Sequence, residues 1–309
     1  MDAERKPYGE VSLLDFQNRF PTEESCWSYL VQMRWPKGYH CPDCPKAKIH
    51  FKPSTHTFQC YQCDRHTSVT SGTLFHKSHL PLRKWFWAIF LMATSSKGIS
   101  MRNLQKHLGI KTYRAVWLMG HKIRRAMMQR EGLYKLRGNV AVDQMQIGYS
   151  SPEIRRKKRH DNRTRFLMAI QEGKKGNPRF VKFEELESFF KEDLIRPIEK
   201  QIEKGSTLKS DGDASYLAAK EKGYEVDPVV FDKEPDKAKD HLKWIHWVSS
   251  NTKRGLVSTY HGCFPKYRKA YLAESAYRFN RRYWPHQAFD RLLFACVNGP
   301  KITLRQIKT

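Results

Sequence analysis

Apolar residues recur every three or four positions through the first 35 residues, which is the spacing of one face of a helix. The pattern predicts short amphipathic helices within residues 9–35. Thr22 follows a proline and precedes two glutamates, so we expect it to be the N-cap of the second helix. Cys26 falls on the apolar side of that helix, a position typical of a packing thiol rather than a ligand.

A longer helical region is predicted between residues 81 and 128. Its first helix is strongly apolar, and two further helices flank a turn at Gly109. Such a pair is typical of a helix-turn-helix, whose second helix can enter the major groove of DNA. The residues that would lead into the groove are Lys111, Thr112, Tyr113 and Arg114. The alternative is an ordinary helical bundle that links other parts of the chain.

After Gly138 short apolar runs alternate with amphipathic segments, which predicts an α/β domain. Strands are expected at residues 139–143, 165–171 and 206–212, with another within 224–230. Helices are expected at residues 183–201 and across 244–282. The first strand is expected to end on Asp143, and the third to end around Asp211.

Charge narrows the class of partner. The chain of 309 residues carries 57 lysines and arginines against 31 aspartates and glutamates, a formal net charge of +26. An excess of this size favours a polyanion, and we expect double-stranded DNA. No stretch approaches the about 18 apolar residues that span a bilayer, so no membrane partner is expected. An aromatic content of 13% indicates that most of the chain folds.

Two CxxC pairs, Cys41-Pro42-Asp43-Cys44 and Cys60-Tyr61-Gln62-Cys63, are separated by fifteen residues. Four thiolates in this spacing predict a structural Zn²⁺ site whose binding is coupled to folding of a small ribbon. Two disulfides are the alternative, but the chain opens on polar residues without an apolar signal segment, which favours a reducing cytoplasm. The nearby histidines, His40, His50, His56 and His66, are not expected to be ligands, because four sulfurs complete the shell.

Asp143 and Asp211 suit a second kind of metal site. Carboxylates at the ends of strands can hold Mg²⁺ or Mn²⁺ for two-metal phosphoryl transfer. On spacing alone this signal is weak, because aspartate before glycine is also a routine turn.

A basic run lies between the first two predicted strands of the α/β domain. It contains Arg155, Arg156, Lys157, Lys158 and Arg159. We expect a loop that grips DNA phosphates, and the alternative is a solvated patch of charge.

A series of short motifs runs through nearly the whole chain in a fixed order. They are Phe20-Pro21-Thr22-Glu23-Glu24 with Cys26, Arg34-Trp35-Pro36-Lys37-Gly38, Thr70-Ser71-Gly72-Thr73, Val142-Asp143, Ser210-Asp211-Gly212 with Tyr216, Gly223-Tyr224, Lys253-Arg254, Tyr260-His261-Gly262, Tyr271-Leu272-Ala273-Glu274, and Tyr277-Arg278-Phe279-Asn280-Arg281-Arg282. With the cysteine pairs, this series resembles the DDE transposases of bacterial insertion sequences that carry an N-terminal zinc ribbon, the ISXO type. The resemblance implies an RNase H-like catalytic domain that cuts and joins DNA with divalent metal ions.

Position by position, Asp143 matches the family's first catalytic carboxylate and Asp211 its second. The third position departs from the usual acid, and His246 and Asn251 are the candidates, with His246 favoured as an Mg²⁺ ligand. Lys253 matches the family's trailing lysine and would contact a DNA phosphate. A packing role for His246 between two tryptophans remains the alternative. Glu274 is expected to be a structural partner more readily than a ligand.

The resulting fold class is α/β: an RNase H-like catalytic domain preceded by a small zinc ribbon and a helix-turn-helix domain. The expected segments are residues 1–36 (N-terminal helices), 37–76 (zinc ribbon), 77–132 (helix-turn-helix region), 133–290 (catalytic domain) and 291–309 (C-terminal tail). The expected function is binding of terminal inverted repeats, DNA cleavage and strand transfer by a nucleoid-associated cytoplasmic protein acting as a homodimer or higher oligomer on DNA. The alternatives are a catalytically inactive DNA-binding relative and an RNase H-like nuclease or resolvase.

Overall fold

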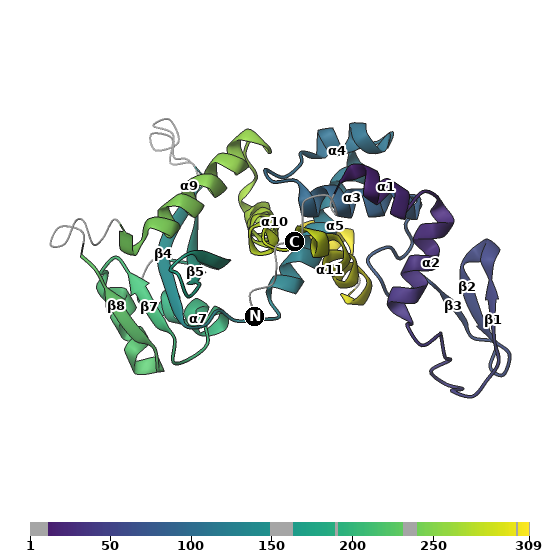
Figure 1. Ribbon diagram of the computed structural model, residues 1–309, viewed down its shortest axis with the longest axis horizontal. Coiled ribbons are helices and arrows are strands. Elements are labelled where there is room, and N and C mark those ends of the chain that lie inside the picture. Colours follow the sequence, from purple (N-terminus) through teal and green to yellow (C-terminus); the bar gives the residue numbers. More distant parts are fainter. Residues whose placement is uncertain (1–11, 149–162, 189–190, 231–239, 301, 309) are drawn as a thin grey trace. The chain divides into compact units, whose positions relative to one another are not determined.

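The computed structural model describes residues 12–148, 163–188, 191–230, 240–300 and 302–308 (Figure 1). Internal contacts divide the chain into two units. Unit 1 contains the described residues of Met1–Ser95, Met101–Ala126 and Tyr283–Thr309, and unit 2 those of Ser96–Ser100 and Met127–Arg282. Within these described residues, no helix has both the length and the apolar character needed to cross a bilayer.

Unit 1 begins with two short helices, α1 (Leu13–Arg19) and α2 (Glu23–Arg34). The side chain of Ser12 caps α1 by accepting a hydrogen bond from the first turn. Thr22 caps α2 in a reciprocal arrangement: Thr22 accepts from the backbone of Ser25, and the Ser25 side chain accepts from the backbone of Thr22. The predicted N-cap is therefore confirmed, since both caps satisfy N–H groups that the helix leaves unpaired.

A three-stranded antiparallel sheet follows, with the order β1-β2-β3. Its strands are β1 (Ile49–Lys52), β2 (Thr57–Cys60) and β3 (His66–Ser68). Strand β2 is central, and β1 pairs with it so that Phe51 lies opposite Phe58.

The remaining elements of unit 1 are helices α3 (Leu82–Thr94), α4 (Met101–Leu108), the first part of α5 (Tyr113–Glu131), α11 (Pro285–Asn298) and α12 (Leu304–Lys308). Helix α11 packs against α3 and α2. The expected boundary at residue 290 falls inside α11. The helix joins unit 1 because its Phe289 ring packs against Phe16, Phe20 and Phe86.

Unit 2 is built on a five-stranded sheet with the order β6-β5-β4-β7-β8. The strands are β4 (Asn139–Ile147), β5 (Thr164–Glu172), β6 (Pro178–Leu186), β7 (Thr207–Ser210) and β8 (Glu225–Pro228). Neighbours among β4, β5 and β6 are antiparallel, whereas β4, β7 and β8 run parallel.

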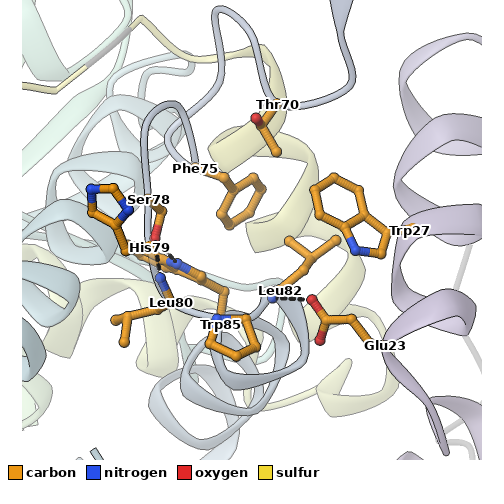
Figure 2. A pocket seen from close by; sticks show the side chains of 10 residues that line it. Glu23, Trp27, Thr70, Phe75, Ser78, His79, Leu80, Leu82 and Trp85 are labelled. Atoms are coloured by element: carbon orange, nitrogen blue, oxygen red, sulfur yellow. Dashed lines mark hydrogen bonds between the residues drawn. The ribbon is translucent and has the colours of Figure 1, made fainter. Parts of the chain in front are cut away.

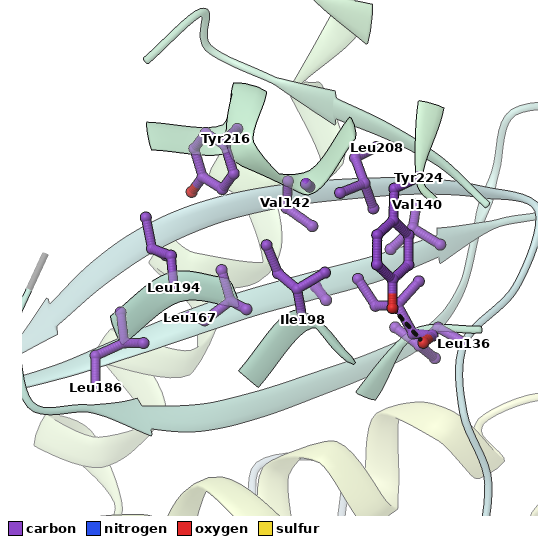
Figure 3. Packing of buried hydrophobic residues seen from close by; sticks show 13 residues of the cluster. Leu136, Val140, Val142, Leu167, Leu186, Leu194, Ile198, Leu208, Tyr216 and Tyr224 are labelled. Atoms are coloured by element: carbon purple, nitrogen blue, oxygen red, sulfur yellow. Dashed lines mark hydrogen bonds between the residues drawn. The ribbon is translucent and has the colours of Figure 1, made fainter. Parts of the chain in front are cut away.

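Helices cover both faces of this sheet. On one face, α7 (Lys191–Gln201) and the 3₁₀ segment η3 (Ala214–Lys222) pack on a core of buried aliphatic and tyrosine side chains (Figure 3). On the other face, a second core lies beneath α9 (Lys243–Ser258) and α10 (Arg268–Arg281). The two cores give unit 2 the helix–sheet–helix layering expected of an α/β domain.

Two sequence-based boundaries in unit 2 are wrong. The first strand does not end at Asp143 but continues to Ile147, because Met145 and Ile147 keep the buried alternation going. The expected helix at 183–201 begins only at Lys191, and residues before it form β6. Antiparallel pairing with β5 holds β6 extended, an interaction between distant residues that local periodicity does not reveal.

Candidate metal centres and nucleic-acid surface

Four cysteine sulfurs come together beside the small sheet of unit 1. Cys41 and Cys44 precede β1, Cys60 ends β2, and Cys63 lies in the turn before β3. All four Sγ atoms lie within 4.8 Å of one another, and those of Cys41 and Cys63 are 3.6 Å apart. Tetrahedral zinc with Zn–S bonds of about 2.3 Å separates sulfurs by about 3.8 Å, so this cluster fits Zn²⁺.

The backbone favours the thiolate form of one of the four cysteines, Cys60, whereas the pKa values of Cys44 and Cys63 are raised. Backbone N–H groups of Cys63 and Gln62 lower the pKa of the Cys60 thiol to about 7. The cluster contains no histidine, as the sequence predicts. The ring of His56 stacks instead on Trp27, with centroids 3.9 Å apart. Cys26 is fully buried in α2, as expected for a packing residue.

Asp143 lies within β4, and Asp211 follows the neighbouring strand β7. Strands β4 and β7 pair in parallel with Asn139 opposite Thr207, a constant offset of 68 positions (207 − 139). Asp211 lies the same 68 positions after Asp143 (211 − 143) and directly follows the last residue of β7. The paired residues of β4 and β7 end at Ala141 and Lys209, and the same offset continued for two positions leads to Asp143 and Asp211. Because neighbouring strands are about 4.8 Å apart, this offset places the two backbone positions near each other.

Alternation along β4 decides which face Asp143 occupies. Val140 and Val142 belong to the core under α7, whereas Ala141 and Met145 belong to the core under α9. Asp143 shares the parity of Ala141 and Met145, so its side chain is on the α9 face.

Helix α9 brings two further side chains to this carboxylate. His246 and Lys253 are both exposed, and the charge of each favours the ionised form of Asp143. Burial acts in the opposite direction and is the largest effect. Together with the neighbouring Asp211 carboxylate, it raises the pKa of Asp143 to about 6. The geometry therefore holds a half-buried acid whose negative charge a bound cation would stabilise.

A tight turn holds Asp211. Its Oδ1 accepts a hydrogen bond from the backbone N–H of Asp213, 3.2 Å away. Gly212 has a φ of 86°, in the left-handed region, and a Cβ there would lie 2.7 Å from Val230. Asp213 then caps η3 by accepting from the backbone of Ser215. Asp211 therefore lies both in an ordinary Asp-Gly turn and at the end of a strand, so the turn does not argue against a site there.

The two candidates for the third position have different surroundings. His246 is exposed and within electrostatic range of Asp143, so the packing role between two tryptophans does not describe it. The Oδ1 atom of Asn251 instead accepts a hydrogen bond of 2.8 Å from Arg254. Glu274 is fully buried in α10, where it accepts hydrogen bonds from Tyr260 and Arg278. This contact pattern matches the structural role expected for it.

Asp143, Asp211 and His246 are less tightly gathered than the cysteines. Among the described residues, the cysteine set is the one group of three or more potential metal ligands whose donor atoms all lie within 4.8 Å of one another. The donor set at Asp143 nevertheless fits a hard divalent cation, because a half-buried carboxylate lies within electrostatic range of a second acid at the end of the adjacent strand.

The predicted groove-leading residues lie at the start of α5. Lys111, Thr112, Tyr113 and Arg114 are all exposed. The preceding turn is braced by the Gln105 side chain, whose amide donates to the carbonyls of Ile110 and Lys111 at 3.0 and 3.2 Å. The basic run of Arg155, Arg156, Lys157, Lys158 and Arg159 lies outside the described residues.

Unit 1 also contains an aromatic cavity of about 440 Å³ (Figure 2). Trp27, Phe75 and Trp85 contribute much of its lining. The carboxylate of Glu23 at its edge is already engaged, because it accepts from the backbone N–H groups of Leu82 and Arg83 at 2.6 and 2.9 Å. None of the predicted site residues lines this cavity.

One exposed aromatic residue near the carboxylates was not singled out by sequence reasoning. Trp247 on α9 is 52% exposed and lies next to His246 in the chain. From the sequence alone Trp247 is one more apolar residue of a predicted helix. The sequence contains no signal that distinguishes an exposed tryptophan from a buried one.

Comparison with protein families gives two matches. Residues 135–280 match the family described as the ISXO2-like transposase domain, and residues 21–66 match the transposase zinc-ribbon domain. The resemblance to insertion-sequence transposases with an N-terminal zinc ribbon is thereby confirmed. The first match contains both aspartates and α9, and the second contains the four cysteines.

A curated protein of Halobacterium salinarum is also similar. It is described as an uncharacterized protein in transposable element ISH50, and it is 29% identical over 131 residues. The aligned region covers 41% of this chain and 43% of the relative, so the similarity spans less than half of either protein.

Proposed function

We propose that this chain is a metal-dependent DNA transposase. The observation that supports the proposal is the position of Asp143 on β4 and of Asp211 directly after the adjacent parallel strand β7, close enough for the charge of Asp211 to raise the pKa of Asp143, within the segment that matches a transposase domain. The strand order β6-β5-β4-β7-β8, three antiparallel strands extended by two parallel ones, supports an RNase H-like arrangement of this domain.

In this proposal Asp143 and Asp211 hold divalent metal, Mg²⁺ or Mn²⁺, with His246 as the third ligand. The bound metal supplies Lewis-acid activation of the attacking oxygen and stabilises the leaving one. Lys253 projects from the exposed side of α9 and holds a phosphate of the scissile strand by its charge. The helix-turn-helix residues at the start of α5 and the zinc ribbon bind the ends of the element, and a dimer pairs two ends.

The test uses the DNA that flanks the reading frame as substrate, with a supercoiled plasmid as target. We expect Mg²⁺- or Mn²⁺-dependent cleavage at the element ends, followed by joining of the freed 3′-hydroxyl to the plasmid. Cleavage without joined products would indicate the nuclease or resolvase alternative instead.

A second candidate function is DNA binding without catalysis. The looser gathering of the acidic site favours it, since among the described residues no third carboxylate joins Asp143 and Asp211 in a close cluster. This candidate predicts salt-sensitive binding of DNA with no metal-dependent nicking, whatever the metal concentration.

A further inference from the structure

Helix α9 carries two neighbouring stripes of outward-facing residues. Its inner side, with Ile245 and Val248, packs on the sheet. His246 and Lys253, seven positions apart, form one stripe that faces Asp143. Trp247, Asn251 and Arg254, at spacings of four and three, form the next stripe around the helix.

Contacts with neighbouring side chains and backbone hold the residues of the second stripe in place. The ring of Trp247 packs edge-on against Trp244, with centroids 6.2 Å apart and an interplanar angle of 88°. Trp244 is itself fixed, because its indole N–H donates to the carbonyl of Gly176 at 2.7 Å. Arg254 is held by Asn251. The stripe therefore presents a braced aromatic ring and, about 10 Å along the helix axis, an oriented guanidinium.

The positive charge of α9 indicates which kind of ligand this stripe could bind. Helix α9 contains Lys243, Lys253 and Arg254 and no acidic residue, so basic side chains lie one turn before and about two turns after the exposed ring. Lys243 itself lies over the ring of Trp244 and pairs with Asp240 at 4.0 Å. A half-exposed tryptophan in such a setting suits a nucleobase, because stacking uses the ring and the phosphates meet the cations. The bases of an intact duplex already stack on one another, which leaves an unpaired base as the ligand.

We propose that the Trp247–Asn251–Arg254 stripe binds an unpaired nucleotide of the DNA strand next to the scissile phosphate. Trp247 stacks on the base, and Arg254 contacts the phosphate backbone. This inference rests on the proposed function. The stripe lies next to His246 and Lys253 on the surface of α9, and only the proposed function makes Asp143 part of a site that cuts DNA.

Binding is measured with the full-length protein without added divalent metal, so that strand cleavage does not contribute. The probes are a fluorescein-labelled blunt duplex and the same duplex with an unpaired end. We expect the wild-type protein to prefer the unpaired end, and Trp247→Ala to reduce that preference about five- to a hundredfold while the blunt duplex is bound as before. Trp247→Phe should keep most of the preference.

The matched control is Val257→Ala, which removes exposed apolar surface from the same helix outside the stripe. A second readout places 2-aminopurine in the unpaired end, where stacking on Trp247 should quench its fluorescence in the wild type but not in Trp247→Ala. Circular dichroism of each variant checks that α9 remains folded.

Three outcomes would overturn the inference. They are the absence of any preference for the unpaired end in the wild type, an unchanged preference in Trp247→Ala, and an equal loss of affinity for both probes. A change of oligomeric state with unchanged preference would assign Trp247 to a protein interface instead. A wild-type protein that fails to cleave DNA in the presence of metal would count against the proposed function but would leave this measurement intact.

Discussion

The zinc ribbon and the acidic site are both candidate metal centres, yet they differ in how far the polypeptide assembles them. In the ribbon, four sulfurs already lie within 4.8 Å of one another. In the sheet of unit 2, Asp143, Asp211 and His246 come within electrostatic range but do not form such a cluster.

The two sites differ in how closely their donor atoms gather, and we attribute this to the charge of the donors and to the function of each site. The pKa values of Cys44 and Cys63 are raised, which favours neutral thiols that can approach without mutual repulsion, whereas two carboxylates repel until a cation arrives. A structural site also gains from being closed, while a catalytic site must leave positions for substrate oxygens. We infer that the ribbon needs its metal to fold, and that the acidic site needs its metal and DNA to close.

The sharpest test of this contrast is loss of one zinc ligand. Cys60→Ser should abolish zinc binding and unfold the ribbon, because structural zinc contributes about 10–16 kcal/mol of apparent binding free energy. DNA binding should fall with it, while Mn²⁺ binding by the acidic site should persist. Metal analysis, circular dichroism and Mn²⁺ titration of the full chain measure the three effects.

Cys263→Ser is the matched control, since Cys263 lies outside the ligand cluster. It should retain one zinc per chain. If Cys60→Ser also loses Mn²⁺ binding, the two centres are not independent and the contrast fails.

The next test removes an acid. Asp143→Asn or Asp211→Asn should lower strand cleavage by at least about a thousandfold, because each removes a metal ligand from the transition state. DNA binding should survive. Asp213→Asn is the control: asparagine caps η3 as well as aspartate does, and the change removes a charge only two residues from Asp211. Single-turnover cleavage of a labelled end is the measurement, and full activity in either site variant would refute the assignment.

A smaller effect is expected at the third position. His246→Ala should raise the Mn²⁺ concentration required for cleavage about ten- to a hundredfold, and His246→Asp should restore it, because a carboxylate is the harder donor. Ser250→Ala, an exposed change on the same face of α9 that removes neither a proposed ligand nor a charge, should leave the requirement unchanged. Should Asn251→Ala shift the metal requirement while His246→Ala does not, the third ligand is Asn251.

Local signals in the sequence were sufficient for part of this architecture. The cap at Thr22 and the paired cysteines depend on neighbours a few residues away, and both are found where they were expected. Asp143 and Asp211 were identified by resemblance, since an aspartate before glycine is also an ordinary turn. The register of β4 against β7, which places them side by side, is a pairing between residues 68 positions apart.

The features that escaped prediction depend on tertiary context. Strand β6 contains Glu184 and Glu185, whose charges resemble the outer face of a helix, and only pairing with β5 keeps it extended. Helix α11 joins unit 1 through Phe289, far along the chain from its partners. The exposure of Trp247 follows from the rotation of α9 on the sheet, which periodicity alone does not determine.

The smallest expected effect is the pH dependence of metal binding at the acidic site. Burial and Asp211 raise the pKa of Asp143 to about 6, so its carboxyl group stays protonated to a higher pH than an exposed aspartate. A proton must leave before a cation binds, so Mn²⁺ affinity should be constant above about pH 7 and fall roughly tenfold per unit below about pH 6. Calorimetric titration of Mn²⁺ at several pH values measures this. Asp143→Asn should weaken the dependence without abolishing it, because the other ligands must also be deprotonated to bind the cation. A wild-type midpoint near pH 4, that of an exposed aspartate, would show that burial does not control this acid.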